Sequence, residues 1–225
     1  MTSPSPARCR PLGERAVQLD FPGQSPSLAL QQSLWCLRDQ LLAAGDVLDC
    51  VPGMGNLTWI FDPDRLDSTE AAERLLRHWQ AVQGRPAPAP GEGRLVEVPV
   101  HYGGEAGPDL ADVAAHHGLA PRELVRLHSE AAYRVFFLGF LPGFAYLEGL
   151  PPALHTPRRA TPRTAVPAGS VGIGGAQTGI YPSASPGGWQ LIGRTSLPLF
   201  DAGAEPPTLL QPGDRLRFVV ERCDD

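Results

Sequence analysis

Hydrophobic positions in the first third of the chain follow two different periods. Glu14–Phe21 alternates polar and apolar residues, as a strand with one buried face does. Ser27–Ala44 places leucines at helical spacing up to a glycine stop, which predicts an amphipathic helix. Val47–Val51 and Leu57–Asp62 predict two further strands, because a turn of sequence PGMGN separates them.

A second helix is predicted to begin at Asp67, which can cap it, with Glu70 three residues later. A strand at Arg94–His101 completes the order βαββαβ, that of a ferredoxin-like domain. This last strand can belong to either domain. The first dozen residues, rich in proline, serine and arginine, are predicted to be a frayed tail. The buried stripe of the second helix consists of Ala72, Leu75, Leu76 and Trp79.

The second half of the chain is predicted to be mostly β. Asp109–His116 and Pro121–Ala131 predict two short helices. From Tyr133 onward, short apolar runs alternate with turns dense in glycine and proline, and Asp214–Glu221 predicts a closing strand. Several short strands of this kind indicate a barrel-like domain.

A proline-rich segment, GRPAPAPGE, separates the two halves between Gln83 and Gly93. Its alternating prolines stiffen the chain and leave it nothing to pack, so we place a domain boundary there. We therefore predict an α+β protein. An N-terminal α/β domain of the ferredoxin-like type covers residues 1–90, linker included, and a mostly β barrel domain covers residues 91–225.

Composition and charge exclude several classes of function. The 225 residues carry 19 Lys and Arg against 24 Asp and Glu, a net charge of -5, without a long basic run, which argues against nucleic acid and anionic membranes as partners. The N-terminus lacks the apolar segment of a secretory signal, and no run is long enough to span a membrane, so we expect a cytoplasmic protein. The cysteines are scattered without metal-ligand spacing, so we expect reduced thiols and no bound metal.

The most informative stretch is Phe136–Phe200, where glycine and proline alternate with aromatic and aliphatic residues. Such side chains need a core, so this stretch is predicted to form a tightly turned sheet whose loops carry the function. It contains no familiar phosphate-binding loop. Covalent catalysis finds no support, because Ser170 and Cys223 have no base adjacent in sequence.

Three blocks in this stretch resemble signatures of a known family: GFLPGFAYLEGLP, TPRRATPRTAVPAGSVGIGGAQTGIYP and SPGGWQLIGRT. They are similar to the KipI family, also called allophanate hydrolase subunit 1 or PxpB, the B subunit of 5-oxoprolinase. The upstream segment GGEAGPDLADVA, the domain order and the length agree, so the resemblance covers nearly the whole chain. It implies that the barrel domain is cyclophilin-like.

The resemblance also implies an activity and partners. Members of this kind work in a bacterial ATP-dependent 5-oxoprolinase, which opens 5-oxo-L-proline to L-glutamate with ATP, together with Mg²⁺, as co-substrate. The implied partners are a KipA-like subunit, in direct contact, and a lactam-utilisation subunit. We expect the chain to be inactive alone, since it has no self-contained nucleophile or phosphate loop.

Two alternatives stay open. The KipI name implies an inhibitor of a sensor histidine kinase, which needs only a protein-binding surface. The same domain type resembles the carboxyltransferase subdomains C and D of urea carboxylase, so a carboxyltransferase component is the second alternative. The chain carries no biotin-attachment motif, and biotin would have to arrive on another protein.

The implied chemistry requires cations for phosphate and amide donors for developing oxyanions. Guanidinium groups can pair bidentately with phosphate or with the substrate carboxylate, although surface ion pairs are the alternative for each arginine. The amides of Gly169–Gly175 can face a ligand, and polar side chains can orient it. The predicted binding residues are Arg158, Arg159, Ser170, Gly172, Gln177, Tyr181 and Arg194.

His128 and Arg163 are the predicted catalytic residues. Arg163 lies between two blocks shaped by glycine and proline, so its guanidinium is well placed to bind a phosphoryl group or a carboxylate. His128 precedes the glycine-rich region and can exchange a proton near neutral pH. The alternative for His128 is a buried core histidine, because it shares an apolar helix face with leucines.

Overall fold

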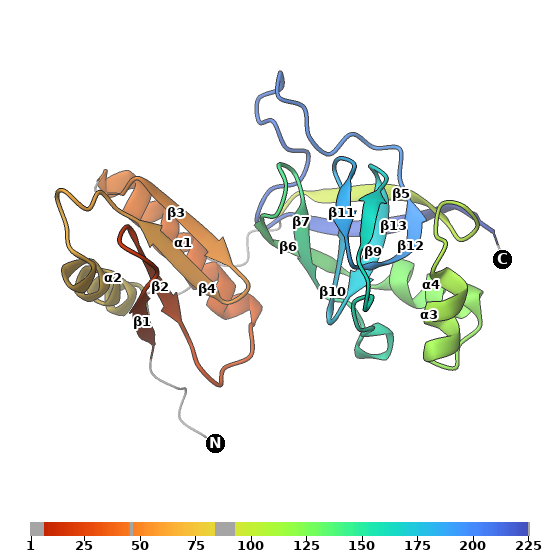
Figure 1. The fold of residues 1–225 in the computed structure, drawn as a ribbon, viewed down its shortest axis with the longest axis horizontal. Coiled ribbons are helices and arrows are strands. Elements are labelled where there is room, and N and C mark those ends of the chain that lie inside the picture. Colours follow the sequence, from red (N-terminus) through yellow and green to blue (C-terminus); the bar gives the residue numbers. More distant parts are fainter. Residues whose placement is uncertain (1–6, 46, 84–92, 225) are drawn as a thin grey trace. The chain divides into compact units, whose positions relative to one another are not determined.

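The computed structural model describes residues 7–45, 47–83 and 93–224, and the chain divides into two compact units, Met1–Gly91 and Glu92–Asp225. Figure 1 shows a small helix-and-sheet unit and a barrel. The predicted proline-rich linker and the first half of the predicted N-terminal tail lie outside the described residues. The predicted α+β class is confirmed.

The N-terminal unit is a four-stranded antiparallel sheet with two helices, and the strand order is β1-β2-β4-β3. Its core contains two tryptophans, Trp59 and Trp79, with the leucines of both helices. Its elements are β1 (Arg8–Pro11), β2 (Ala16–Asp20), α1 (Leu28–Ala44), β3 (Asp49–Gly53), β4 (Asn56–Ile60) and α2 (Ser68–Gln83).

The edge strand of this sheet differs from the prediction. β1 lies within the segment predicted to be a frayed tail, and it pairs with β2 from Arg8 to Pro11. The strand predicted to close the βαββαβ order is β5 (Leu95–Tyr102), and it lies in the barrel. Because β5 pairs there with β13 (Arg215–Cys223) along its whole length and also with β12 (Gln190–Arg194), the barrel satisfies its backbone on both edges.

The C-terminal unit is a closed barrel of strands in the order β10-β7-β6-β13-β5-β12-β9. Only β13 and β5 run parallel among the pairs of this barrel, and β8 (Arg163–Val166) pairs with β11 (Ser185–Gly187) in a separate ribbon. The remaining barrel strands are β6 (Tyr133–Leu138), β7 (Ala145–Glu148), β9 (Ser170–Gly174) and β10 (Gln177–Ile180).

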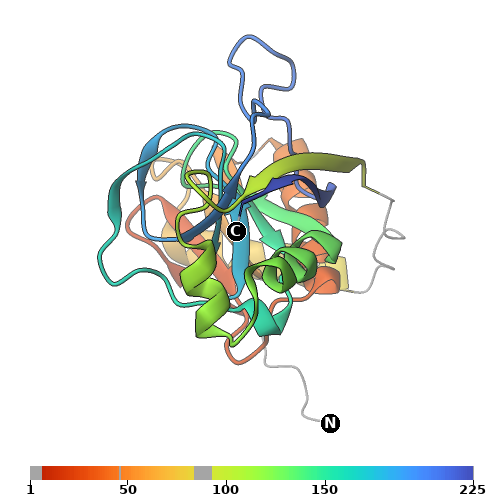
Figure 2. The same ribbon diagram turned by 90° about the vertical axis from the view of Figure 1, so that its right-hand side faces the viewer.

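Two short helices cover one side of the barrel, as the sequence predicts. α3 (Leu110–His116) packs against β12, and α4 (Pro121–Glu130) packs against β13. Both face the viewer in Figure 2. A 3₁₀ turn at Pro152–Leu154 also contacts α4. Among the described residues, no helix has both the length and the apolar character needed to cross a membrane.

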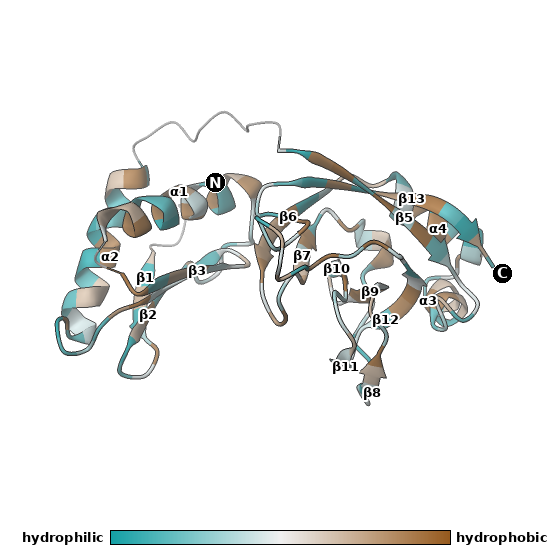
Figure 3. Cartoon of the chain, turned by 90° about the horizontal axis from the view of Figure 1, so that it is seen from above, coloured by the Kyte–Doolittle hydropathy of each residue, from teal (hydrophilic) through white to brown (hydrophobic). Residues whose placement is uncertain are grey.

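Helices α1 and α2 are amphipathic, and Figure 3 shows both brown and teal bands along them. The Ser27 side chain accepts a hydrogen bond from the Leu30 amide and so caps the start of α1. Gly45 ends the same helix with a φ of 76°, a left-handed conformation that costs glycine little. The sequence therefore encodes both boundaries of α1.

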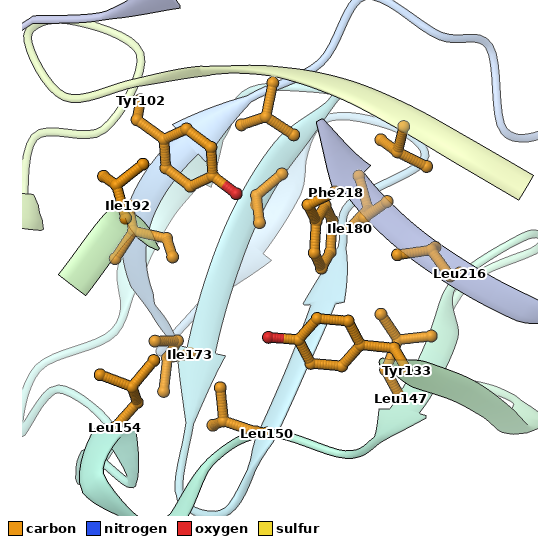
Figure 4. Close-up of a cluster of buried hydrophobic side chains, with 14 of the residues drawn as sticks. Tyr102, Tyr133, Leu147, Leu150, Leu154, Ile173, Ile180, Ile192, Leu216 and Phe218 are labelled. Atoms are coloured by element: carbon orange, nitrogen blue, oxygen red, sulfur yellow. The ribbon is translucent and has the colours of Figure 1, made fainter. Parts of the chain in front are cut away.

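The barrel is filled by side chains, so its interior is a core and not a channel. Figure 4 shows Tyr102 from β5, Tyr133 from β6 and Phe218 from β13 around branched aliphatic residues. The hydroxyl groups of both tyrosines point into this cluster. A functional pocket must therefore lie outside the barrel interior, among the loops and the β8–β11 ribbon.

Candidate functional site

A pocket of ≈ 290 Å³ opens on the C-terminal unit between its loops and the β8–β11 ribbon. Apolar walls with a few polar groups are typical of small-molecule sites. The walls come from the turn after β6, from β7, from the loop before β8 and from the segment around β11. The pocket is lined by Phe140, Phe144, Tyr146, Arg158, Arg159, Pro162, Tyr181, Pro186, Gly187, Gly188 and Trp189.

Aromatic rings in edge-to-face contact build the floor of this pocket. The ring centroid of Phe144 lies 5.3 Å from that of Tyr181 and 5.5 Å from that of Trp189, with interplanar angles of 82° and 83°. Edge-to-face pairs are a favourable arrangement of aromatic quadrupoles. These three rings are buried with Val166 and Leu191 in a small core of their own, so the floor is rigid.

Two glycines make room for the large rings. A Cβ atom at Gly174 would lie 2.5 Å from Nε1 of Trp189, and one at Gly187 would lie 2.5 Å from the hydroxyl oxygen of Tyr181. Both distances are too short for any side chain. Within the glycine-rich segment, Gly174 therefore makes room for the indole ring of Trp189, and the presentation of amides to a ligand stays a prediction.

Phe140 stands at the mouth of the pocket. Its side chain is 59% exposed, and its φ of 66° is the only positive φ of a non-glycine residue among the described residues. Such a backbone conformation costs about 1–3 kcal/mol and persists only where the surroundings impose it. Here the turn between β6 and β7 imposes it, with hydrogen bonds from the Leu141 amide to Gly139 and from the Gly139 amide to Phe144.

Arg158 contributes a positive charge to the aromatic wall. Its Cζ atom lies 5.8 Å from the centroid of the Trp189 ring, within the range of a cation–π contact. In the part of the chain that the structure describes, Arg158 has no carboxylate within ion-pair distance. Its guanidinium is therefore free to meet an anionic group of a ligand.

The Asp109 carboxylate binds Arg159 and Arg163, the other two arginines in this part of the chain. It accepts two hydrogen bonds from Arg163, both at 2.8 Å, and one from Nη1 of Arg159 at 3.1 Å. It also accepts the backbone N–H of Leu191 at 2.7 Å, and its exposed fraction is only 3%. The hydrogen bonds to Asp109 raise the pKa of the Arg163 guanidinium above its usual value.

A second cavity of ≈ 250 Å³ lies on the α3 side of Arg158 and Arg159, which line both cavities. Its other polar lining residues are Asp112, His116, Thr156 and Gln190. The loop at 157–163 therefore forms a wall with an aromatic cavity on one side and a polar cavity on the other. Burial in this neighbourhood lowers the pKa of His117, whose Nε2 lies 2.9 Å from Oγ1 of Thr156.

The structure brings together three of the predicted binding residues, Arg158, Arg159 and Tyr181, in the aromatic pocket. Burial raises the pKa of the Tyr181 hydroxyl, and a hydrogen bond from the Trp189 backbone partly offsets this effect. Arg163, predicted as catalytic, lies next to this group, but its guanidinium is paired with Asp109. A catalytic role for Arg163 stays a prediction.

The other predicted binding residues do not line the aromatic pocket. Ser170 and Gly172 are buried in β9, where their backbones pair with the neighbouring strands β10 and β12. Gln177 begins β10 opposite Gly174. Arg194 uses its Nε atom to donate a hydrogen bond to the Ala168 carbonyl, at 2.9 Å.

His128 lies inside the barrel core with an exposed fraction of 0%. Because the Thr178 hydroxyl donates to the Gly172 carbonyl, it accepts from Nε2 of His128 at 3.0 Å, and Nδ1 then accepts from the Tyr102 hydroxyl at 2.9 Å. Burial lowers the pKa of His128 to about 3. This geometry favours the core-histidine alternative, and a role in proton transfer stays a prediction without geometric support.

Sequence patterns do not single out Asp109, Phe140 or Phe144 as parts of the site, and for Tyr146 and Trp189 they favour packing over ligand contact. Asp109 lies in the segment GGEAGPDLADVA, which carries part of the family resemblance, but no local pattern reveals its contacts with arginines 50 and 54 positions further along the chain. The aromatic residues do have a local signal, since each flanks a glycine or proline turn in the central stretch. Among residues 7–45, 47–83 and 93–224, no group of three metal-ligating side chains comes together.

The sequence matches the family model described as carboxyltransferase domain, subdomain C and D, over residues 7–210. It is 53% identical over 218 residues to the B subunit of 5-oxoprolinase from Escherichia coli O157:H7, covering 96% of this chain and 97% of that protein. The protein of the same name from Haemophilus influenzae is 50% identical over 211 residues, covering 94% of this chain and 96% of the relative.

Two solved structures share this fold. TTHA0988 superposes with a TM-score of 0.75 at 40% identity, and the match covers 94% of this chain but 40% of that longer chain. The urea amidolyase of Kluyveromyces lactis superposes with a TM-score of 0.81 over 99% of this chain and 15% of its own. At 20% identity, the second likeness concerns the fold alone.

Proposed function

Because this chain belongs to the family of carboxyltransferase subdomains C and D, we propose that it is the B subunit of an ATP-dependent 5-oxoprolinase. Relatives with that name match it at 50% identity or more over nearly their full length. The substrate is 5-oxo-L-proline, the product is L-glutamate, and ATP with Mg²⁺ is the co-substrate. The enzyme acts in the cytoplasm.

The single observation that carries this proposal is the aromatic pocket with the free guanidinium of Arg158 at its wall. 5-Oxoproline is a flat five-membered ring with one carboxylate. Its ring packs against the faces of Tyr181 and Trp189, and its carboxylate pairs with Arg158. The pocket volume of ≈ 290 Å³ is ample for one such molecule.

The lactam is resonance-stabilised and therefore a poor electrophile. Transfer of the γ-phosphoryl group of ATP to its amide oxygen leaves an imidate-like carbon that water attacks. Breaking the C–N bond then frees the amine and leaves an acyl phosphate, which a second water hydrolyses to the glutamate side chain and phosphate. Arg158 and Arg159 supply positive charge next to the ring as negative charge develops on the oxygens.

This chain holds only part of the machinery. None of the described residues lining the pocket is a nucleophile with an adjacent base, and the described residues hold no phosphate-binding glycine loop. The proposed assembly therefore includes a KipA-like subunit in direct contact and a lactam-utilisation subunit. Those two proteins complete the site and contribute to ATP binding.

The test measures ADP release that depends on 5-oxoproline, for this chain alone and with the KipA-like and lactam-utilisation subunits added singly and together. Activity is expected only with all three proteins. ATPase activity without 5-oxoproline serves as the background in every combination. Full turnover by this chain alone contradicts the expectation that the other two subunits are required for activity. No turnover in any combination contradicts the proposed substrate.

Carboxyl transfer is the second candidate function, because the matching family is described by that activity. The same protein combinations, supplied with a biotinylated carrier protein, bicarbonate and urea, distinguish it from lactam opening. Inhibition of a sensor histidine kinase is the remaining alternative, and addition of this chain to a kinase autophosphorylation assay tests it directly.

A further inference from the structure

The arginine loop, residues 157–163, forms one wall of the aromatic pocket and is short of regular secondary structure until β8 begins at Arg163. Two contacts to its backbone hold it to the segment before and at the start of β12. The Arg159 amide donates to the Gly188 carbonyl at 2.8 Å, and the Gln190 side chain donates to the Pro157 carbonyl at 3.0 Å. Neither contact fixes the directions of the arginine side chains.

We propose that Asp109 is a positioning residue that holds the arginine loop in place as a wall of the aromatic pocket. Its carboxylate meets Arg159 near the start of the loop and Arg163 at its end, so one buried group ties down both halves. The Leu191 amide donates to the same carboxylate, and the Asp109 amide donates to the Leu191 carbonyl at 2.9 Å. Asp109 thereby joins the arginine loop to β12 of the barrel.

Burial makes it costly in free energy to leave the Asp109 carboxylate without hydrogen-bond partners. A carboxylate with an exposed fraction of 3% is stable only when its oxygens are fully hydrogen-bonded, and those of Asp109 receive four hydrogen bonds. The two Arg163 bonds form a bidentate fork, which fixes direction as well as distance. Loss of the carboxylate charge would leave both guanidinium groups partly buried without an anion.

Asp109 also decides which arginine is left for a ligand. It neutralises Arg163 and occupies Nη1 of Arg159, whereas Arg158 keeps its charge without a carboxylate partner among the described residues. A ligand carboxylate in the aromatic pocket is therefore directed to Arg158. This consequence for substrate binding rests on the proposed function, but the anchoring of the loop does not.

Limited proteolysis with trypsin tests the anchoring. Trypsin must take an arginine side chain into its specificity pocket, so the side chains of Arg159 and Arg163 are protected while Asp109 binds them. Asp109→Asn is expected to accelerate cleavage after Arg159 and Arg163 by tenfold or more. Cleavage after Arg65, an exposed arginine of the N-terminal unit outside this loop, is the internal reference in the same digest.

Asp214→Asn is the matched control variant. Asp214 is also a buried barrel carboxylate, with an exposed fraction of 7%, and it accepts hydrogen bonds from Arg94 and from the Gln211 amide. It is expected to lower the melting temperature without changing cleavage in the arginine loop. Equal cleavage rates after Arg159 and Arg163 in wild type and Asp109→Asn overturn the proposal, as does equal acceleration by Asp214→Asn.

Steady-state kinetics of the assembled enzyme test the consequence for binding. Asp109→Asn is expected to raise KM for 5-oxoproline about tenfold with a smaller change in kcat, and Asp109→Glu to recover part of the loss. An unchanged KM in a variant with accelerated cleavage overturns the binding role. An assembly that never opens 5-oxoproline overturns the proposed function instead, while the digest still decides whether Asp109 anchors the loop.

Discussion

The guanidinium of Arg158 lies over the indole ring of Trp189, 5.8 Å from Cζ to the ring centroid. A cation that packs on an aromatic face has no counter-charge beside it, whereas a carboxylate partner balances the positive charge so that the pair has no net charge. Arg158 and Arg163 belong to the same loop and illustrate both situations, since Arg163 is paired with Asp109. The loop therefore holds one arginine without a carboxylate partner among the described residues and one that is paired with a carboxylate.

Substitution of Arg158 by lysine tests this division. Lysine keeps the charge but loses the planar fork and its stacking on Trp189, so KM for 5-oxoproline should rise about tenfold, the equivalent of ~1.4 kcal/mol. The assembled enzyme is assayed at saturating ATP. Arg217→Lys is the control, because Arg217 is an exposed barrel arginine paired with Glu97, away from the pocket. Equal effects of both variants contradict the assignment.

Gly174→Ala should damage the pocket by displacing Trp189. The new Cβ atom would meet the indole at 2.5 to 2.6 Å, so the ring must move out of its place in the floor. We expect a large rise in KM together with a change in the tryptophan emission spectrum of the protein, to which Trp189 contributes as one of four tryptophans. Gly175→Ala is the matched control, because a Cβ atom there meets nothing within 4 Å and only the strain of its φ of 67° remains. A similar KM in both variants argues against the steric explanation.

Local patterns in the sequence predict the helices of this protein well. They predict poorly those features that depend on contacts between residues far apart in the sequence, such as the sheet to which a strand belongs. Ser27 and Gly45 mark the ends of α1 because caps act within a few residues. The sequence leaves open to which domain β5 belongs, since its alternation of apolar and polar residues fits either sheet. Its pairing with β13, near the C-terminal end of the chain, places it in the barrel.

The candidate site shows the same limit. The glycine- and proline-rich blocks pointed to the correct region, and three of the arginine and tyrosine candidates do meet in one pocket. The apolar helix face that contains His128 predicts a core histidine as the alternative to a catalytic one, and the complete burial of His128 favours this alternative. The role of Asp109 depends on partners in a loop 50 or more positions away, and no pattern within the chain encodes that distance.

Phe140 should take part in assembly with the KipA-like subunit. It is a large, exposed apolar side chain at the pocket mouth, and Phe200, 39% exposed, lies against Gly143 of the same turn. Aromatic anchors are typical centres of protein interfaces. Phe140→Glu is expected to weaken co-elution of the two proteins in size-exclusion chromatography with light scattering. Leu42→Glu, at an exposed apolar position of α1 in the N-terminal unit, is the control. Co-elution that survives Phe140→Glu unchanged contradicts this role.

His128→Asn should reduce stability and leave turnover per folded molecule unchanged. Asparagine cannot span from the Tyr102 hydroxyl to the Thr178 hydroxyl as the imidazole does, so at least one buried polar group loses its partner at a cost of about 1–3 kcal/mol. Melting temperature and turnover are measured on the same reconstituted samples. Lower turnover at an unchanged melting temperature would instead support the catalytic prediction for His128.

The same residue makes stability depend on pH in a defined direction. His128 has a pKa of about 3 in the folded protein, because burial opposes its charge, and about 6.5 in the unfolded chain. Between these values the unfolded state binds the extra proton, so the contribution of neutral His128 is fully present above pH 6.5 and is lost as the pH falls. The free energy of unfolding should decline by about 1.4 kcal/mol per pH unit from this group. Denaturant titrations from pH 7 to 4 measure the slope, and His128→Asn should show a shallower one. Equal slopes in wild type and variant would mean that His128 is not held neutral in the core.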